Sequence, residues 1–264
     1  MTTSQRLHQA RRNFVARWRN PRAVHRDEAL RRLDAIVVLG LAVLALVVAV
    51  QGDEAIARAM NGFPAWVYAV FGYVTRIGAS GYIFAASTII LLAALLLRKR
   101  GQGATFDRAC LFVAERAGFV LIVNAVSGIA SQVLKHLFGR ARPSLIDVVG
   151  PFHFDMFAMS SRYASMPSGH SITAFATALA LSYLMPRWRW AFVFVAVMVG
   201  VSRVVISAHY PSDVLVGAVI GSLCAILLRR AFARRGIAFR HTPAGPRLRG
   251  AGKVWPALAR VFNS

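Results

Sequence analysis

Hydrophobic residues are concentrated in long runs without charged side chains, and shorter segments rich in arginine, glycine and proline separate these runs. Six such runs are candidates for transmembrane helices, and several of them approach the roughly 20 residues that cross the hydrocarbon core of a bilayer. They cover residues 35–52, 77–97, 117–134, 163–186, 190–202 and 214–228. The last two reach a spanning length only with their flanking residues. The pattern predicts an all-α integral membrane bundle of six transmembrane helices.

Another uncharged stretch lies between Arg58 and Arg76, but its composition differs from that of the six runs. Asn61, Gly62 and Pro64 interrupt its hydrophobic residues, and aromatic residues follow them. Such a mixture is typical of segments at the interface between lipid and water. We therefore expect this stretch to lie at the membrane surface.

Composition supports a membrane protein and explains the strong positive charge. Of the 264 residues, 57% are hydrophobic and 16% are charged, which is too apolar for an ordinary soluble domain. The net charge of +22 resembles that of a nucleic-acid-binding protein. With six spans, however, 25 of the 32 lysines and arginines fall on the side of the two termini. The positive-inside rule then places both termini in the cytoplasm. We expect contact with anionic lipids of the inner leaflet and no nucleic-acid partner.

The chain divides into three regions by charge and hydropathy. Residues 1–34 form a basic cytoplasmic segment, which is either an amphipathic helix on the inner leaflet or a flexible tail. Residues 35–230 form the six-helix membrane domain. Residues 231–264 form a basic cytoplasmic tail, and their glycines and prolines predict flexibility.

Three polar clusters occur at the ends of hydrophobic runs. They are KHLFGRARP at 135–143, PSGH at 167–170 and SRVVISAHYPSD at 202–213. The six-span topology places all three outside the cytoplasm and at the same membrane depth. A compact helical bundle can therefore bring them together.

The first functional element in these clusters is a set of groups suited to a phosphoryl group. Transfer of a phosphoryl group requires positive charge and hydrogen-bond donors around its equatorial oxygens. Lys135, Arg142 and Arg203 supply the charge, and arginine donates two parallel hydrogen bonds to phosphate. Ser168 and Gly169 begin a predicted helix, whose unpaired N–H groups form an anion site.

The second functional element is a pair of histidines with different surroundings. Asp213 follows His209 by four residues, and Pro211 between them favours a helix start. The carboxylate can then orient the imidazole so that its other nitrogen attacks phosphorus. His170 contributes a backbone N–H group at the helix start, and its side chain is placed to protonate the departing oxygen and then activate water.

Each cluster by itself has a structural explanation. PSGH is compatible with ordinary helix capping, the two cations of the first cluster with lipid headgroup contacts, and the histidine and aspartate with a tight turn. Their joint occurrence, in order and on one face of the membrane, favours a catalytic site.

The clusters resemble the signature of the type-two phosphatidic acid phosphatase (PAP2) superfamily, which is K-x6-RP, PSGH and SR-x5-H-x3-D. Every position of this pattern is matched, namely by Lys135, Arg142, Pro143, Pro167, Ser168, Gly169, His170, Ser202, Arg203, His209 and Asp213. The resemblance covers a motif core at residues 117–228. It implies a lipid phosphate or pyrophosphate phosphatase that needs no metal or other cofactor. In that mechanism His209 forms a phosphohistidine, Asp213 orients it and His170 is the acid.

The resemblance also implies a location in the bacterial inner membrane, with a periplasmic active site. Bacterial members of the family act on undecaprenyl pyrophosphate, phosphatidylglycerophosphate, phosphatidic acid or the phosphates of lipid A. Among these we favour a polyprenyl (undecaprenyl) pyrophosphate. Transfer of the phosphoryl group to another lipid is an alternative. A different class of function, an anionic-lipid transporter or binding scaffold, would need the cations but not His209.

Overall fold

The structure, a computed structural model, describes residues 43, 46–47, 49–99, 103–242 and 245–250. Helix dominates the described chain, which confirms the predicted all-α membrane architecture. A helix covers residues 49–60. The later helices are α3 (Ala65–Ile77), α4 (Ser80–Lys99), α5 (Ala104–Phe138), α6 (Ile146–Val149), α7 (Gly169–Leu184), α8 (Arg189–Val205) and α9 (Pro211–Arg234). Short 3-10 turns cover Pro143–Leu145, Ser161–Tyr163 and Pro186–Trp188.

Among the described residues, four helical stretches are long and apolar enough to cross a membrane. They are Ala65–Arg98, Phe106–Phe138, Pro186–Val205 and Pro211–Arg234. Together they identify an integral membrane protein. The predicted span at 35–52 lies mostly outside the described residues, and α7 has only 16 residues. The predicted number of six spans is therefore not confirmed.

The stretch between Arg58 and Arg76 differs from its sequence-based interpretation as a surface segment. Pro64 is the N-cap of α3, and the helix continues to Ile77. Only a short break at Gly78 separates α3 from α4. The two helices therefore belong to one apolar stretch, Ala65–Arg98. The polar residues before Pro64 end the preceding helix, but the residues after it are apolar enough to continue as a membrane helix.

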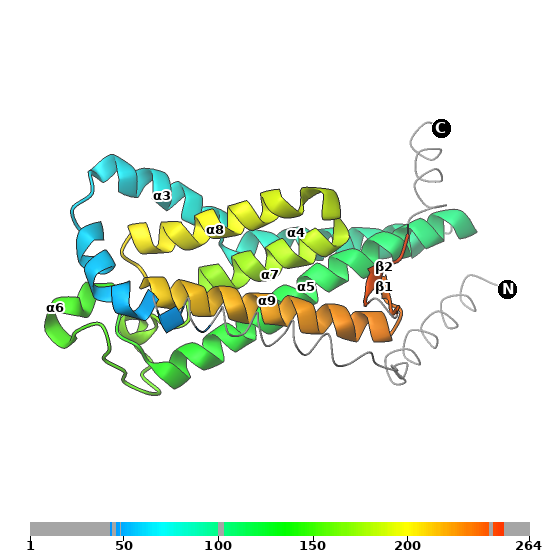
Figure 1. Ribbon diagram of the computed structural model, residues 1–264. Coiled ribbons are helices and arrows are strands. Elements are labelled where there is room, and N and C mark those ends of the chain that lie inside the picture. The colour runs from blue at the N-terminus through cyan, green and yellow to red at the C-terminus, as the bar shows by residue number, and fades with distance from the viewer. Residues whose placement is uncertain (1–42, 44–45, 48, 100–102, 243–244, 251–264) are drawn as a thin grey trace. The chain divides into compact units, whose positions relative to one another are not determined.

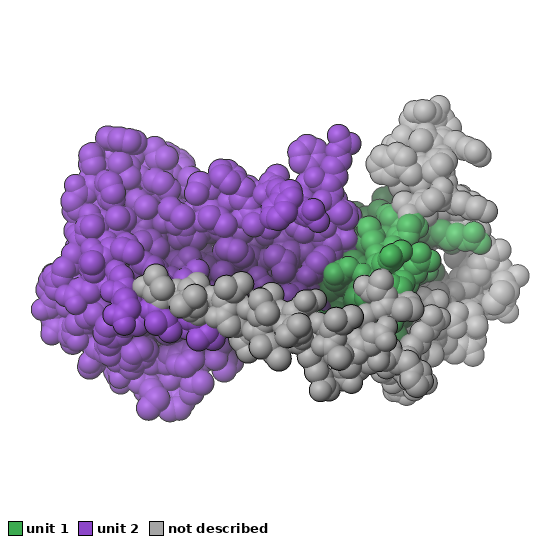
Figure 2. Space-filling view, in the orientation of Figure 1, with its two compact units in different colours: residues 1–27, 85–121, 227–264 green, residues 28–84, 122–226 purple. Residues whose placement is uncertain are grey.

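The chain divides into two compact units, which Figure 2 shows in separate colours. Unit 1 comprises Met1–Asp27, Ala85–Leu121 and Leu227–Ser264, and unit 2 comprises Glu28–Phe84 and Ile122–Ile226. Within unit 2, α7 packs along α8, and α8 also packs against α3 (Figure 1). The last turns of α5 and α8 and the first turn of α9 lie at the same end of this unit (Figure 1). The first and third predicted clusters include residues of these turns, and the PSGH cluster lies at the start of α7.

Two glycines allow α9 to approach the backbone of α7 within unit 2. A Cβ atom at Gly217 would lie 2.7 Å from the Ser168 carbonyl oxygen, and one at Gly221 would lie 2.2 Å from the Ile172 carbonyl oxygen. Both distances are too short for a side chain. The G-x3-G spacing is the small-residue pattern that lets membrane helices pack closely. It holds the start of α7, with the PSGH cluster, against the helix that carries Asp213.

Replacement of Gly221 by alanine is therefore expected to lower the free energy of unfolding by about 2 kcal/mol, since overpacking forces the two helices apart. Thermal unfolding in detergent measures this effect. Gly128→Ala in α5 is the matched control, because a Cβ atom there meets nothing within 4 Å. Equal stability of the two variants would contradict the proposed close packing.

Unit 1 has its own aromatic core. The Phe119 ring packs edge-on against the rings of Phe232 and Phe239, with centroids 5.2 and 4.9 Å apart. The strands β1 (Phe239–Arg240) and β2 (Arg247–Leu248) pair in antiparallel fashion. Glu115 accepts a hydrogen bond from the Ala238 N–H group at 3.0 Å. Phe232, Phe239 and the two strands belong to the segment 231–264, for which the composition predicts a flexible tail, but they pack and pair in a regular way.

The remaining terminal predictions lie outside the described residues. They concern the amphipathic or flexible character of residues 1–34 and the flexibility of 251–264. Contact between these basic segments and anionic lipids also stays a prediction.

Candidate active site

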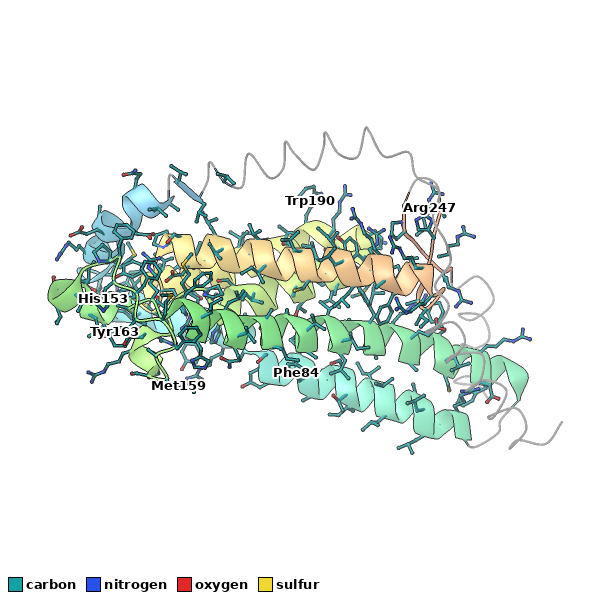
Figure 3. The ribbon with its side chains drawn as sticks, turned by 90° about the horizontal axis from the view of Figure 1, so that it is seen from below. Phe84, His153, Met159, Tyr163, Trp190 and Arg247 are labelled. Atoms are coloured by element: carbon teal, nitrogen blue, oxygen red, sulfur yellow. The ribbon has the colours of Figure 1, made fainter. Side chains whose placement is uncertain are left out.

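The residues of the three clusters come together at one end of unit 2. Lys135 lies in the last turn of α5, Ser168 immediately precedes α7, and Arg203 lies in the last turn of α8. The loop between α5 and α7 lies at the same end. Figure 3 shows His153 and Tyr163 of this loop close together, and their ring centroids are 5.8 Å apart.

The start of α7 faces the lysine of the first cluster. A Cβ atom at Gly169 would lie 3.5 Å from the Lys135 Nζ atom and 3.2 Å from the Ser131 Oγ atom. The absence of a side chain at Gly169 therefore allows the ammonium group to approach the helix terminus. Ser168 is the N-cap, and its hydroxyl oxygen accepts hydrogen bonds from the Ser171 N–H group and hydroxyl at 3.4 and 2.9 Å.

One backbone N–H group at the start of α7 forms a hydrogen bond within the protein, and the next two do not. The Ser168 N–H group donates to the Asp213 carbonyl oxygen at 3.1 Å, so it is not available to a ligand as the sequence suggests. The next two N–H groups, of Gly169 and His170, have no acceptor within the described part of the chain. They point out of the first turn and remain available to an anion.

Of the two arginines of the site, Arg203 is buried and Arg142 half-buried, and both are only partly paired. Arg203 is 9% exposed, and its Nη1 atom donates to the Thr75 hydroxyl at 2.7 Å. Burial lowers the pKa of Arg142, and the nearby Asp213 carboxylate opposes this effect. No described residue accepts a hydrogen bond from the Nε atom of either arginine. The site therefore contains guanidinium donors that a bound anion can satisfy.

His170 lies among the cations. The cationic side chains of Arg203, Lys135 and Arg142 lie close to its imidazole. The ring also lies against the α3–α4 break, since a Cβ atom at Gly78 would be 3.5 Å from its Cδ2 atom. The structure thus brings this histidine close to the second histidine, His209.

An apolar cavity of about 160 Å³ begins beside this break and runs along α7 and α8. Ile77 and Gly78 line it on one side, and Thr173 and Thr177, one and two turns after His170, line it on another. Valine and phenylalanine side chains of α8 complete the wall. Apolar space therefore adjoins the polar site.

His209 faces Asp213, but at a greater distance than the sequence spacing suggests. The Nδ1 atom of His209 lies 3.8 Å from the Asp213 Oδ2 atom, which is an ion-pair distance and too long for a hydrogen bond. Burial lowers the pKa of His209 to about 4, and the Asp213 carboxylate opposes this shift. The imidazole is therefore neutral at pH 7 and retains a lone pair for nucleophilic attack.

The residues that hold Asp213 are not part of the sequence pattern. Its Oδ2 atom accepts hydrogen bonds from the Ser165 hydroxyl at 2.6 Å and the Tyr210 N–H group at 3.0 Å. Its Oδ1 atom accepts one from Arg140 at 2.7 Å, and Arg140 also contacts Asp53. Arg140 lies inside the first cluster, but the K-x6-RP pattern does not include it. Thr75, Asp53 and Ser165 carry no sequence signal of this kind.

The structure therefore brings every sequence-predicted site residue to one end of unit 2. Within the described ranges, no three histidine, cysteine, aspartate or glutamate side chains gather as metal ligands. The prediction of a metal-independent reaction stays a prediction.

Comparisons with known proteins identify the family. Residues 116–237 match the sequence profile of the PAP2 superfamily. The lipid A 1-phosphatase of Rhizobium johnstonii is 32% identical over 191 residues, which cover 72% of this chain and 75% of that protein. The lipid A 1-phosphatase of Rhizobium etli is 32% identical over 199 residues, which cover 75% and 82%.

A solved structure supports the same assignment. The crystal structure of a transmembrane PAP2-type phosphatidylglycerolphosphate phosphatase from Bacillus subtilis matches with a TM-score of 0.51 and 26% identity. The match covers 74% of this chain and 93% of that chain. With its membrane-spanning helices and its complete set of motif residues, the chain belongs to the PAP2 superfamily and is a lipid phosphatase that hydrolyses phosphate esters.

Proposed function

We propose that this protein removes a phosphate group from a lipid at the outer face of the inner membrane, without a metal ion, through a phosphohistidine intermediate. One observation carries the proposal. Lys135, Arg142 and Arg203 lie near the start of α7, where His170 and His209 are also close to each other. This arrangement combines an anion site with a nucleophile and a proton donor, which phosphoryl transfer requires.

Binding of the phosphate group relies on charge and on unpaired donors. The three cations neutralise the phosphate oxygens, and the free Nε atoms of Arg142 and Arg203 donate hydrogen bonds to them. The N–H groups of Gly169 and His170 add two more donors. The apolar cavity beside Gly78 accommodates part of the hydrocarbon chain of the same lipid.

In the first chemical step, the Nε2 atom of His209 attacks phosphorus. The nitrogen–phosphorus bond forms while the bond between phosphorus and the lipid oxygen breaks, and His170 gives its proton to that oxygen. The imidazole of His209 gains positive charge in this step. The Asp213 carboxylate, 3.8 Å from its Nδ1 atom, stabilises that charge.

The second step reverses the roles. His170, now neutral, takes a proton from a water molecule whose oxygen attacks the phosphorus. The nitrogen–phosphorus bond breaks and its electron pair returns to His209. Inorganic phosphate leaves, and His170 is again protonated.

The 1-phosphate of lipid A is the substrate that we place first. The sequence alone favours undecaprenyl pyrophosphate, but the two Rhizobium proteins, both named lipid A 1-phosphatase, align over most of their length at 32% identity. An outer-face active site, which the distribution of arginine and lysine favours, has access to lipids of the outer leaflet. Undecaprenyl pyrophosphate remains the second substrate to test.

Phosphate release by the detergent-purified protein tests this proposal. The assay offers lipid A, undecaprenyl pyrophosphate, phosphatidylglycerophosphate and phosphatidic acid separately, with EDTA present throughout. We expect release from lipid A at a rate at least about tenfold above that from any other lipid, and no effect of EDTA. Mass spectrometry of the lipid product locates the phosphate that was lost.

Other outcomes would correct specific parts of the proposal. Preference for undecaprenyl pyrophosphate would overturn the substrate and retain the mechanism. Loss of lipid phosphate without release of inorganic phosphate would indicate transfer to another lipid. No reaction with any lipid would reject the enzyme and favour an anionic-lipid transporter or binding scaffold.

A further inference from the structure

A buried charged network lies behind His209, and the reaction described above uses only one of its members. Arg140 is 1% exposed and pairs with two carboxylates, that of Asp53 at 2.9 Å and that of Asp213 at 2.7 Å. Its guanidinium also donates to the Ser212 hydroxyl at 2.7 Å and to the Pro151 carbonyl oxygen at 2.8 Å. Both aspartates are fully buried.

Asp53 contacts the start of α9 as well as the arginine. Its Oδ1 atom accepts a hydrogen bond from the Ser212 N–H group at 3.0 Å, and its Oδ2 atom accepts one from the Ser212 hydroxyl. Ser212 lies between His209 and Asp213 in the sequence. Asp53, from an earlier helix, therefore holds the backbone segment that carries both members of the nucleophilic pair.

Stability alone does not account for these buried charges. Removing three ionised groups from water has a large desolvation penalty, and well-packed apolar residues often stabilise a core better. A network of this kind is better explained by the electrostatic requirements of a neighbouring group. The nearest reacting group is His209, whose imidazole becomes positively charged when the bond to phosphorus forms.

The charges of the network explain why two aspartates are present. Arg140 alone would hold the Asp213 carboxylate in place but would also cancel its negative charge. Asp53 adds a second negative charge, so that the three groups together carry a net charge of about −1. That net charge remains available to the imidazole across the 3.8 Å gap between His209 and Asp213.

We propose that Asp53 and Arg140 are positioning residues for catalysis: Arg140 fixes the Asp213 carboxylate, and Asp53 offsets the charge of Arg140 so that Asp213 stabilises the phosphorylated His209. This inference rests on the proposed phosphohistidine mechanism. Neither residue touches the phosphate. Their loss therefore affects kcat, and the KM for the lipid stays within about twofold of the wild type.

The test compares variants that differ in network charge. Asp53→Asn keeps the size of the side chain but makes the network neutral. We expect kcat to fall about 30-fold. This loss is smaller than the loss seen when the orienting aspartate of a catalytic triad is itself replaced. Asp53→Glu keeps the charge, and its kcat is expected to exceed that of Asp53→Asn. The double variant Asp53→Asn/Arg140→Gln restores the net charge of −1 through Asp213. We expect it to regain about tenfold in kcat over Asp53→Asn.

The matched control is an exposed ion pair at the same end of unit 2. Arg58 pairs with Asp147 at 2.6 Å, and both side chains are at least half exposed. Arg58→Gln is expected to leave kcat and KM unchanged. All variants are compared as monodisperse, folded protein, judged by size-exclusion chromatography and thermal unfolding.

The outcomes separate this inference from the proposed function. Two outcomes would overturn the inference: a double variant that is no more active than Asp53→Asn, or equal losses of kcat in Asp53→Asn and Asp53→Glu. Either would show that the network only stabilises the structure and that its net charge does not affect catalysis. Wild-type activity in Asp53→Asn would also overturn it, although the phosphatase mechanism would stand. A wild-type protein that forms no phosphohistidine would remove the basis of both.

Discussion

The variant His209→Ala is expected to lose about 10⁴-fold or more in kcat, because it lacks the atom that bonds to phosphorus. In the wild type the neutral His209 imidazole is buried, 2% exposed, and lies 3.8 Å from the Asp213 carboxylate. Rapid acid-free quenching of the wild type with a ³²P-labelled lipid should trap a protein-bound label that is stable in base and labile in acid, as expected for a phosphoramidate. The variant should show no such label.

His153→Ala provides the control for this prediction. His153 lies at the same end of unit 2 but is exposed and contacts only the Tyr163 ring among aromatic groups of the described chain. We expect it to retain wild-type turnover and the protein-bound label. Label on the His209→Ala protein, or turnover close to that of the wild type, would assign the nucleophile to another residue.

The second large effect is expected for Arg203→Ala, with a loss of about 10³-fold in kcat/KM. The guanidinium is buried, Thr75 holds its Nη1 atom, and its Nε atom has no acceptor among the described residues. It is therefore oriented for an anion that the protein itself does not supply. Arg203→Lys keeps the charge but loses the planar donor geometry, so we expect an intermediate loss.

Inhibition by orthovanadate, an analogue of phosphate, gives an independent measurement for this arginine. The inhibition constant should rise strongly in Arg203→Ala and less in Arg203→Lys. Arg162→Ala is the control, since this side chain is exposed and only its carbonyl oxygen contacts Arg142. Unchanged vanadate inhibition in Arg203→Ala would exclude the arginine from the phosphate site.

The sequence indicated the site because its chemistry follows local patterns. A lysine at a helix end, PSGH at a helix start and His209 four residues before Asp213 each depend on spacing within a short segment. The structure places all of these at one end of unit 2. The pair Gly217 and Gly221 was equally visible as G-x3-G, but its meaning required knowledge of the partner helix.

Two local expectations changed because tertiary contacts competed for the same groups. The Ser168 N–H group, expected to bind an anion, donates instead to the Asp213 carbonyl oxygen. The Asp213 carboxylate, expected to bond directly to His209, accepts hydrogen bonds from Ser165, Tyr210 and Arg140 and remains 3.8 Å from the imidazole.

By itself, the sequence determined the membrane character, the helical class, the family signature and the candidate residues for phosphate binding. These properties depend on hydropathy and short-range spacing, which are readable along a chain. Only the tertiary structure decided how Asp213 is held. Arg140 joins residues 87 and 73 positions away, and sequence spacing carries no signal for contacts over such separations. The buried charges of Asp53 and Arg140 acquire a role only when folding brings them behind His209.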